Sequence, residues 1–225
     1  MDINNFTRSH KLLDLSRQFR QWKSLSPLSN AQRSERKNRA AVLVCLFEEE
    51  DVIYVILTKR SPKLSSFSGQ VALPGGRTDE GDTDDIRTAL REAEEEIGLD
   101  PALVDVVTVL EPFVNKGNVT VVPVIGILWN KKAFNPVPNA DEVESIFYAP
   151  FDLFLKDKNR RQEEREFYGD KCLFHYFDHE TNNQVYVIWA VTAAILITAA
   201  SIGYQRPPEF QPRMPKEWNR NHSRL

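Results

Sequence analysis

The stretch ALREAEEEIGL, residues 89–99, concentrates four glutamates within five positions and ends its charged run at Gly98. Apolar residues recur through it and just before it at intervals of three and four, which predicts a helix with one apolar face from about Asp84 to Ile97. Asp82 or Thr83 can cap the start of this helix, and Gly98 suits its C-terminus.

Three of the glutamates share one face of the predicted helix. Glu96 follows Glu92 by four positions and Glu95 follows it by three. They lie in the last turns, where the helix dipole disfavours negative charge, and Arg91 compensates only part of it. The cluster is either a solvated acidic face or a site for a hard divalent cation such as Mg²⁺ or Mn²⁺.

The turn LPGG, residues 73–76, favours the cation site. Its two glycines let the backbone approach a ligand closely. Gly76 stands fifteen positions before Arg91, so one loop and one helix connect the glycine turn to the carboxylates.

The whole segment GGRTDEGDTDDIRTALREAEEEIGL, residues 75–99, resembles the Nudix box, G-x5-E-x7-R-E-U-x-E-E-x-G-U with U apolar. The second half of the box matches residue by residue, at Arg91, Glu92, Ala93, Glu95, Glu96, Gly98 and Leu99. The first half departs from the pattern. Counting back from Arg91 puts Arg77 at the glycine and Thr83 at the first glutamate; taking Gly76 as the glycine puts Asp82 there, with one extra residue.

The preceding segment ILTKRSPKLSSFSGQVALPGG, residues 56–76, resembles the signature of the coenzyme A pyrophosphatase branch of that family, in which a longer box loop is familiar. Eight positions match: Leu57, Thr58, Arg60, Ser61, Gly69, Pro74, Gly75 and Gly76. Ser65 stands where the signature has arginine, and Leu73 where it has phenylalanine. The resemblance implies substrate binding by Lys59, Arg60, Gly69 and Gly75, although the two cations are equally typical of a solvated strand end.

The resemblance implies a Nudix-type α/β/α sandwich with a mixed central sheet. The implied reaction is metal-dependent hydrolysis of the pyrophosphate bond of coenzyme A or acyl-CoA, giving 3′,5′-ADP and (acyl-)4′-phosphopantetheine. One alternative is another nucleoside diphosphate derivative, such as a dinucleotide, NADH or an oxidised nucleotide, for which Ser65 is the best argument. The other is a non-catalytic binding module, against which the three clustered acids argue.

The implied metal ligands come from the box. Glu92 and Glu96 are the first choices, the carbonyl of Gly76 completes the shell, and Glu95 is either a third ligand or the proton acceptor for the attacking water. Arg91 is implied to orient the glutamates through charge-assisted hydrogen bonds.

A further carboxylate is expected from a loop beyond the box, because many Nudix enzymes recruit one as base or ligand. Glu142 and Glu144 are candidates, and Glu142 is favoured because it precedes the predicted strand. An ordinary exposed loop acid is the alternative.

The rest of the chain divides into an N-terminal helix and linker (1–38), the Nudix domain (39–207) and a polar, Pro-rich tail (208–225) that is expected to be extended or mobile. Within the domain, residues 40–60 predict a hairpin, and further strands are expected in 104–114, 118–129 and the segment before the AP at 149–150. Residues 156–171 predict an exposed charged loop. A hairpin is expected around residues 179–184, with its second strand running into a buried helix.

Composition and short motifs bear on partners. The net charge of −3 gives no broad case for nucleic-acid binding. The apolar segment 185–202 predicts a strand and a buried helix rather than a membrane span. Two cysteines in apolar runs predict buried thiols in a reducing compartment. Ser223-Arg224-Leu225 resembles a peroxisomal address, so an import receptor and a peroxisomal location are expected, with the cytosol as the alternative.

Overall fold

Two apolar strands, β1 (Arg39–Glu49) and β2 (Val52–Arg60), form the hairpin at the centre of the computed structural model, which describes residues 9–22, 38–115, 117–167, 169–215 and 218. Glu50 and Asp51 make the turn with φ of 49° and 64°. Left-handed conformations at both positions match the twist of the flanking strands. The hairpin predicted from residues 40–60 is confirmed.

The main sheet has eight strands, ordered β3-β2-β1-β7-β5, with β4 paired to β1, β6 to β7 and β8 to β2. The β1–β7 pair is parallel and the other pairs are antiparallel, so the sheet is mixed, as expected. The remaining strands are β3 (Val71–Ala72), β4 (Gly75–Arg77), β5 (Val104–Val109), β6 (Phe113–Val114), β7 (Thr120–Leu128) and β8 (Val143–Pro150).

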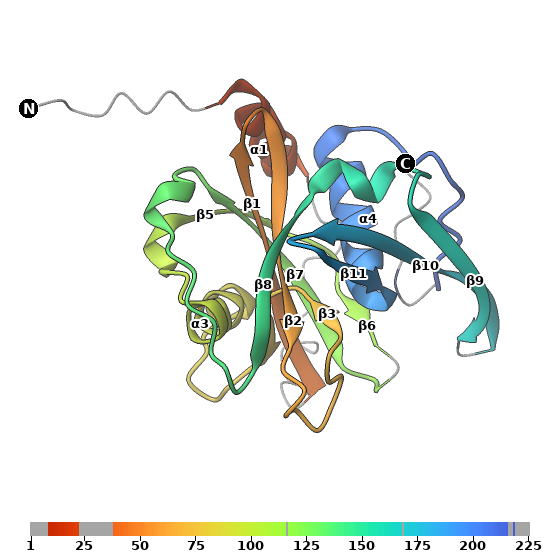
Figure 1. Ribbon diagram of the computed structural model, residues 1–225, viewed down its shortest axis with the longest axis horizontal. Helices are drawn as coiled ribbons and strands as arrows, with labels where there is room; N and C mark the ends of the chain where they lie inside the picture. Colours follow the sequence, from red (N-terminus) through yellow and green to blue (C-terminus); the bar gives the residue numbers. More distant parts are fainter. Residues whose placement is uncertain (1–8, 23–37, 116, 168, 216–217, 219–225) are drawn as a thin grey trace, which may run out of the picture.

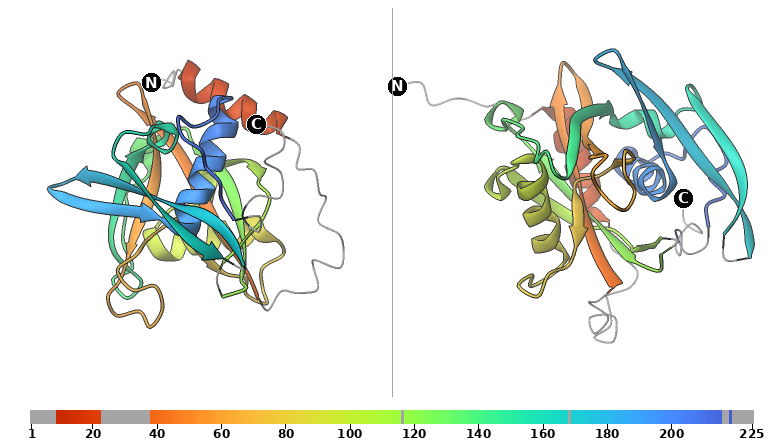
Figure 2. Two further views of the ribbon diagram at one scale, coloured as in Figure 1. Left: turned by 90° about the vertical axis from the view of Figure 1, so that its right-hand side faces the viewer. Right: turned by 60° about the horizontal axis from the view of Figure 1, so that its bottom comes forward.

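Helices cover both faces of this sheet, which gives the predicted α/β/α layering (Figures 1 and 2). Helix α3 (Asp85–Ile97) lies on one face, and α1 (His10–Gln21) and α4 (Ala190–Tyr204) lie on the other. Alternate side chains of β1 serve the two cores. Leu43 and Cys45 belong to the cluster beneath α3, whereas Val44 belongs to the cluster beneath α1 and α4.

Helix α4 is apolar on all sides because α1, residues 151–155 and residues 170–189 pack around it. Phe19 of α1 is fully buried against it, and a Cβ on Gly203 would lie 3.0 Å from the Phe19 ring. The predicted N-terminal helix therefore packs on the body of the protein. Among the residues described, none of the helices combines the length and the apolar content that crossing a bilayer requires.

A separate three-stranded sheet is formed by the part of the chain between β8 and α4. Short 3-10 segments, η2 (Pro101–Leu103), η3 (Lys131–Ala133) and η4 (Phe151–Leu155), connect other elements. The small sheet, ordered β11-β10-β9, comprises β9 (Arg160–Phe167), β10 (Asp170–Thr181) and β11 (Gln184–Trp189). The predicted hairpin around 179–184 is confirmed, with its turn at Asn182 and Asn183.

The prediction of an exposed loop over residues 156–171 is wrong for β9, which pairs along its length with β10. The side chains of β9 are mostly charged and exposed, so its sequence lacks the alternation of apolar and polar residues that predicts a strand. Arg161 and Arg165 instead lie over the ring of Tyr176 on β10. A charged edge strand of this kind also resists pairing with another chain.

The predicted mobile tail is packed where the structure describes it, at residues 208–215 and 218. The ring of Phe210 contacts His175 and Phe177. Trp218 is buried, and its Nε1 donates a hydrogen bond to the carbonyl of Val114 at 2.7 Å. Of the two expectations for the tail, extended or mobile, the packed aromatics Phe210 and Trp218 contradict mobility, whereas residues 210–215 have no helix or strand. The domain boundaries themselves stay predictions.

Phe19→Ala tests whether α1 is an integral part of the domain. The substitution leaves a cavity between α1 and α4, so we expect the free energy of unfolding to fall by about 3–5 kcal/mol. Chemical denaturation followed by tryptophan fluorescence measures it. Arg17→Ala is the control, because the Arg17–Asp14 ion pair is exposed and should change stability by less than about 0.5 kcal/mol. Equal stabilities of the two variants would show that α1 is dispensable.

Candidate active site

Three carboxylates converge at one end of the main sheet. Oxygens of Glu92, Glu96 and Glu142 all lie within 4.8 Å of one another. Glu92 and Glu96 come from α3, while Glu142 comes from the loop that leads into β8. Three like charges this close repel strongly, and a divalent cation with a preference for oxygen ligands relieves that repulsion.

Both ends of α3 are fixed by local hydrogen bonds. The side chain of Asp84 caps the helix by accepting from the backbone N–H of Arg87 at 2.8 Å. The predicted caps, Asp82 and Thr83, are wrong, because Asp82 is engaged elsewhere. At the other end Gly98 adopts φ of 69° and ends the helix as predicted.

Asp82 binds Arg91 in a two-pronged ion pair. Nε of Arg91 lies 3.1 Å from Oδ1 and Nη2 lies 2.9 Å from Oδ2. Thr88 also donates to Oδ2, at 2.9 Å. The hydrogen bonds from Arg91 lower the pKa of the buried Asp82 carboxyl to about 2. Asp82, which departs from the box pattern, therefore connects the loop after the glycine turn to α3 through Arg91.

Arg91 also contacts two glutamates of the helix. Its guanidinium lies 3.0 Å from an oxygen of Glu92 and 2.9 Å from one of Glu95. The Glu95 side chain is 53% exposed, against 4% for Glu96, and it does not belong to the carboxylate cluster. The structure therefore brings Glu142, and not Glu95, together with Glu92 and Glu96.

The two glycines of the turn allow close approach to this cluster. Strand β4 pairs with β1, and Gly75 has φ of 150°; a Cβ there would lie 2.3 Å from the carbonyl oxygen of Ala41. A Cβ on Gly76 would lie 2.4 Å from Oε2 of Glu92. The N–H of Gly75 donates to Oε2 of Glu96 at 3.1 Å, so Gly75 orients a carboxylate.

Glu96 is the most enclosed member of the cluster. Burial raises its pKa to about 8, against the opposing effects of the Gly75 hydrogen bond and of Arg60. Burial also raises the pKa of Glu92. In the absence of a cation Glu96 therefore favours its protonated form at neutral pH, and cation binding there would displace that proton.

The loop that carries Glu142 is held in place from two sides. The N–H of Asn139 donates to the carbonyl of Glu96 at 2.9 Å. The carbonyl of Glu142 accepts from the N–H of Ser61 at 2.8 Å. Glu144, the other predicted candidate, pairs with Lys59 at 2.8 Å and lies outside the cluster.

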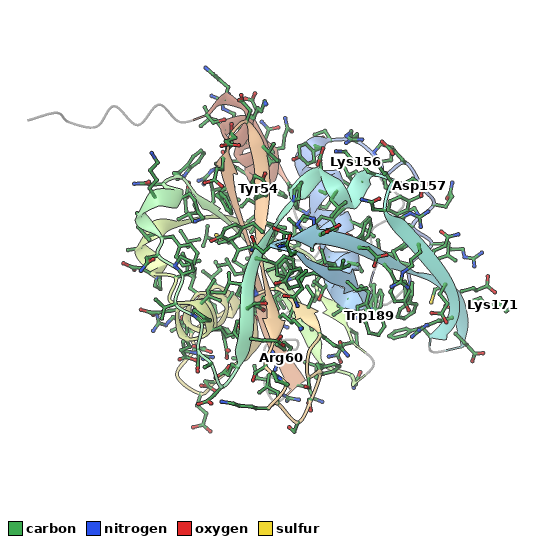
Figure 3. All side chains as sticks on the ribbon, viewed as in Figure 1. Tyr54, Arg60, Lys156, Asp157, Lys171 and Trp189 are labelled. Carbon is green, nitrogen blue, oxygen red and sulfur yellow. The ribbon has the colours of Figure 1, made fainter. Side chains whose placement is uncertain are left out.

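The predicted substrate-binding residues flank the cluster. Arg60 ends β2, and its Nη1 lies 3.8 Å from Oε1 of Glu96 (Figure 3). Its Nε is buried and finds no hydrogen-bond partner among the described residues. Lys59 is engaged by Glu144, and Gly69 donates from its N–H to the carbonyl of Arg60 at 3.2 Å.

The mixed sheet between helical layers, together with this acidic helix and glycine turn, defines a class of protein. The family model described as the NUDIX domain matches residues 37–170. The chain belongs to the Nudix family, and its named relatives make it a pyrophosphohydrolase by class.

Three named proteins are similar in sequence to this chain. Nudix hydrolase 15, mitochondrial, of Arabidopsis thaliana is 59% identical over 86% of this chain and 68% of its own length. Nudix hydrolase 22, chloroplastic, of the same plant is 59% identical over 80% of this chain and 60% of its own length. The mouse peroxisomal coenzyme A diphosphatase NUDT7 is 38% identical over 77% of this chain and 74% of its own length. The match thus leaves about a third or more of each plant relative uncovered.

The peroxisomal location predicted from Ser223-Arg224-Leu225 is wrong by this comparison. The two relatives at 59% identity are named mitochondrial and chloroplastic, and only the mouse protein of these three is named peroxisomal, at 38%. The tripeptide lies outside the described residues. Such a tripeptide acts only when a receptor recognises it, and three residues can match the signal by chance.

Asp82→Asn tests the ion pair that anchors the helix. Removing the charge leaves Arg91 underpaired in a nearly buried position, so we expect the free energy of unfolding at pH 7 to fall by about 2–3 kcal/mol. Because the pKa of Asp82 is depressed, its contribution is present above the ordinary value near 3.8 and disappears as pH falls through about 2. The native protein should therefore lose its advantage over the variant as the pH falls from about 4 to 2, measured by urea denaturation from pH 7 to 2. A constant difference would contradict the assignment.

Glu96→Gln tests the raised pKa of the enclosed carboxyl. In metal-free protein the folded state holds the Glu96 proton more tightly than the unfolded chain, so its stabilisation is full below about 4.5 and is lost as pH rises through about 8. The native protein in EDTA should lose stability between pH 5 and 8, and the variant should lose less. Thermal melting across that range measures both. Glu94→Gln, which changes an exposed neighbour, should follow the native curve.

Proposed function

We propose that the protein hydrolyses the pyrophosphate bond of coenzyme A or acyl-CoA to 3′,5′-ADP and (acyl-)4′-phosphopantetheine. The observation that carries the proposal is the Glu92–Glu96–Glu142 cluster beside a turn and loop that resemble the coenzyme A signature. The name of the mouse relative, a coenzyme A diphosphatase, supports the same substrate.

The cluster fits Mg²⁺ or Mn²⁺. It offers three hard carboxylate oxygens, and Gly76 lies against Glu92 with space for its own backbone but for no side chain. A bound ion would neutralise the diphosphate and lower the pKa of a coordinated water. Glu92, Glu96 and Glu142 would hold the ion, and Arg91 would keep Glu92 in position.

We assign substrate binding and acceptance of the proton from the attacking water to groups that flank the carboxylate cluster. Arg60 lies with its Nη1 3.8 Å from Glu96, its Nε has no hydrogen-bond partner in the part of the chain that the structure describes, and its guanidinium is suited to a phosphate oxygen. Lys59 is held by Glu144, and it would add a diffuse positive potential. Glu95, half-exposed and held by Arg91, is our candidate proton acceptor.

A second candidate substrate is another nucleoside diphosphate derivative, such as a dinucleotide or NADH. The observation that favours it is Ser65, which stands where the signature has arginine and which lies exposed in the loop after Arg60. A short hydroxyl cannot supply the charge of a guanidinium to a distant phosphate.

The decisive experiment is a chromatographic assay of the purified protein with coenzyme A, acetyl-CoA, NADH and a diadenosine polyphosphate, with Mg²⁺ or Mn²⁺. We expect 3′,5′-ADP from coenzyme A. Because each ligand acts in charge neutralisation, Glu92→Gln, Glu96→Gln and Glu142→Gln should lower kcat at least about 100-fold.

The variants separate the roles within the site. Glu94→Gln is the matched control and should keep native turnover. Glu95→Gln should lower kcat while leaving Mn²⁺ affinity, measured by titration calorimetry, unchanged. Intact coenzyme A beside a cleaved dinucleotide would transfer the proposal to the second candidate.

A further inference from the structure

Phe67 is an exposed aromatic residue in an unfavourable backbone conformation. Its side chain is 60% exposed, and its φ is 55°. A bulky residue with positive φ is a genuine outlier, and such strain is found where the surrounding structure enforces it, often at ligand clamps. Neither core packing nor turn chemistry accounts for a phenylalanine here, since glycine or asparagine would suit this conformation better.

The loop that carries Phe67 is closed by its own hydrogen bonds. The carbonyl of Phe67 accepts from the N–H of Gln70, and the carbonyl of Gln70 accepts from the N–H of Arg60 at 2.9 Å. Ser68 Oγ donates to the carbonyl of Pro62 at 3.1 Å. The aromatic ring is therefore presented from a preorganised loop, and ordering it on binding would cost little.

The same loop is fastened to the carboxylate cluster. It starts at Arg60, which lies against Glu96, and Ser61 binds the backbone of Glu142. The loop ends at β3, which leads directly into the glycine turn. Two backbone hydrogen bonds, from Gln70 to Phe67 and from Arg60 to Gln70, thus connect Phe67 to the end of β2. Arg60, labelled in Figure 3, stands at that end.

We propose that Phe67 is the stacking platform for the adenine base of the substrate and so determines the orientation of its nucleoside half. A nucleoside diphosphate needs charge at its phosphates and a flat apolar surface at its base. The cluster and Arg60 supply the first, and Phe67 supplies the second. At Gly69, two positions after Phe67, the loop faces open space, since a Cβ there would meet no atom within 4 Å.

The neighbouring side chains suit a base better than a pantetheine arm. Ser65 and Ser66 are exposed and immediately precede Phe67 in the loop, and their hydroxyls are suited to bond to the edge of a base. The pantetheine arm has no ring, so it would gain no stacking energy. This inference rests on the proposed function only in that the substrate contains adenosine.

The test measures binding of each half of coenzyme A separately. Adenosine 3′,5′-bisphosphate and 4′-phosphopantetheine are titrated calorimetrically into the native protein and into Phe67→Ala, Phe67→Leu and Phe67→Trp, each with Mg²⁺. We expect the alanine and leucine variants to bind the nucleotide about tenfold more weakly, because an aromatic face is lost. The tryptophan variant should bind it as well as the native protein, and 4′-phosphopantetheine should bind all four proteins equally.

Val52→Ala is the matched control, since it removes an exposed apolar side chain at the opposite end of β2. Unchanged nucleotide affinity in Phe67→Ala, weakened 4′-phosphopantetheine instead, or a native protein that binds no adenosine nucleotide would each overturn the inference. Cleavage of a dinucleotide in place of coenzyme A would sink the proposed function alone, because the dependence of nucleotide binding on Phe67 would persist. Melting temperatures verify that all variants are folded.

Discussion

The two-pronged ion pair between Arg91 and Asp82 is the interaction on which the geometry of the site depends. One guanidinium binds Asp82, the carbonyl of Arg77, and carboxylates on the helix that carries Glu92. It therefore fixes the distance between the loop after the glycine turn and α3. Without it, the contact between Gly76 and Glu92 would depend on the hydrogen bond from Gly75 to Glu96 and on the apolar packing beneath α3.

The main elements of the fold were predictable because their signals are local. The sequence predicts α3 from the spacing of its apolar residues, and the helix ends at Gly98 as expected. It also predicts the two hairpins, whose turns are at Glu50–Asp51 and Asn182–Asn183, from the apolar runs on either side. Strand β9 and the packed residues after position 207 were not. Their stabilising contacts, arginines over Tyr176 and the bond from Trp218 to Val114, join residues far apart in the sequence.

The site shows the same division between local and distant information. Glu92 and Glu96 share a helix face, which spacing alone predicts. The same spacing placed Glu95 beside them, but its carboxylate points to Arg91 and solvent. Glu142 enters the cluster because backbone bonds from Ser61 and Asn139 fold its loop onto α3, and no periodicity encodes that. The cap at Asp84 was missed because Asp82, an equally suitable residue, is used to hold Arg91.

The contact between α1 and α4 has a consequence for how the chain folds. Phe19 and Gly203 are 184 positions apart (203 − 19), yet their atoms nearly touch. Closing so long a loop is entropically slow, and it gains nothing until the sheet is in place to receive both helices. We therefore expect the β1–β2 hairpin and its neighbours to form first, with the helical pair docking afterwards. Disturbing the α1–α4 contact would then hasten unfolding far more than it would slow folding.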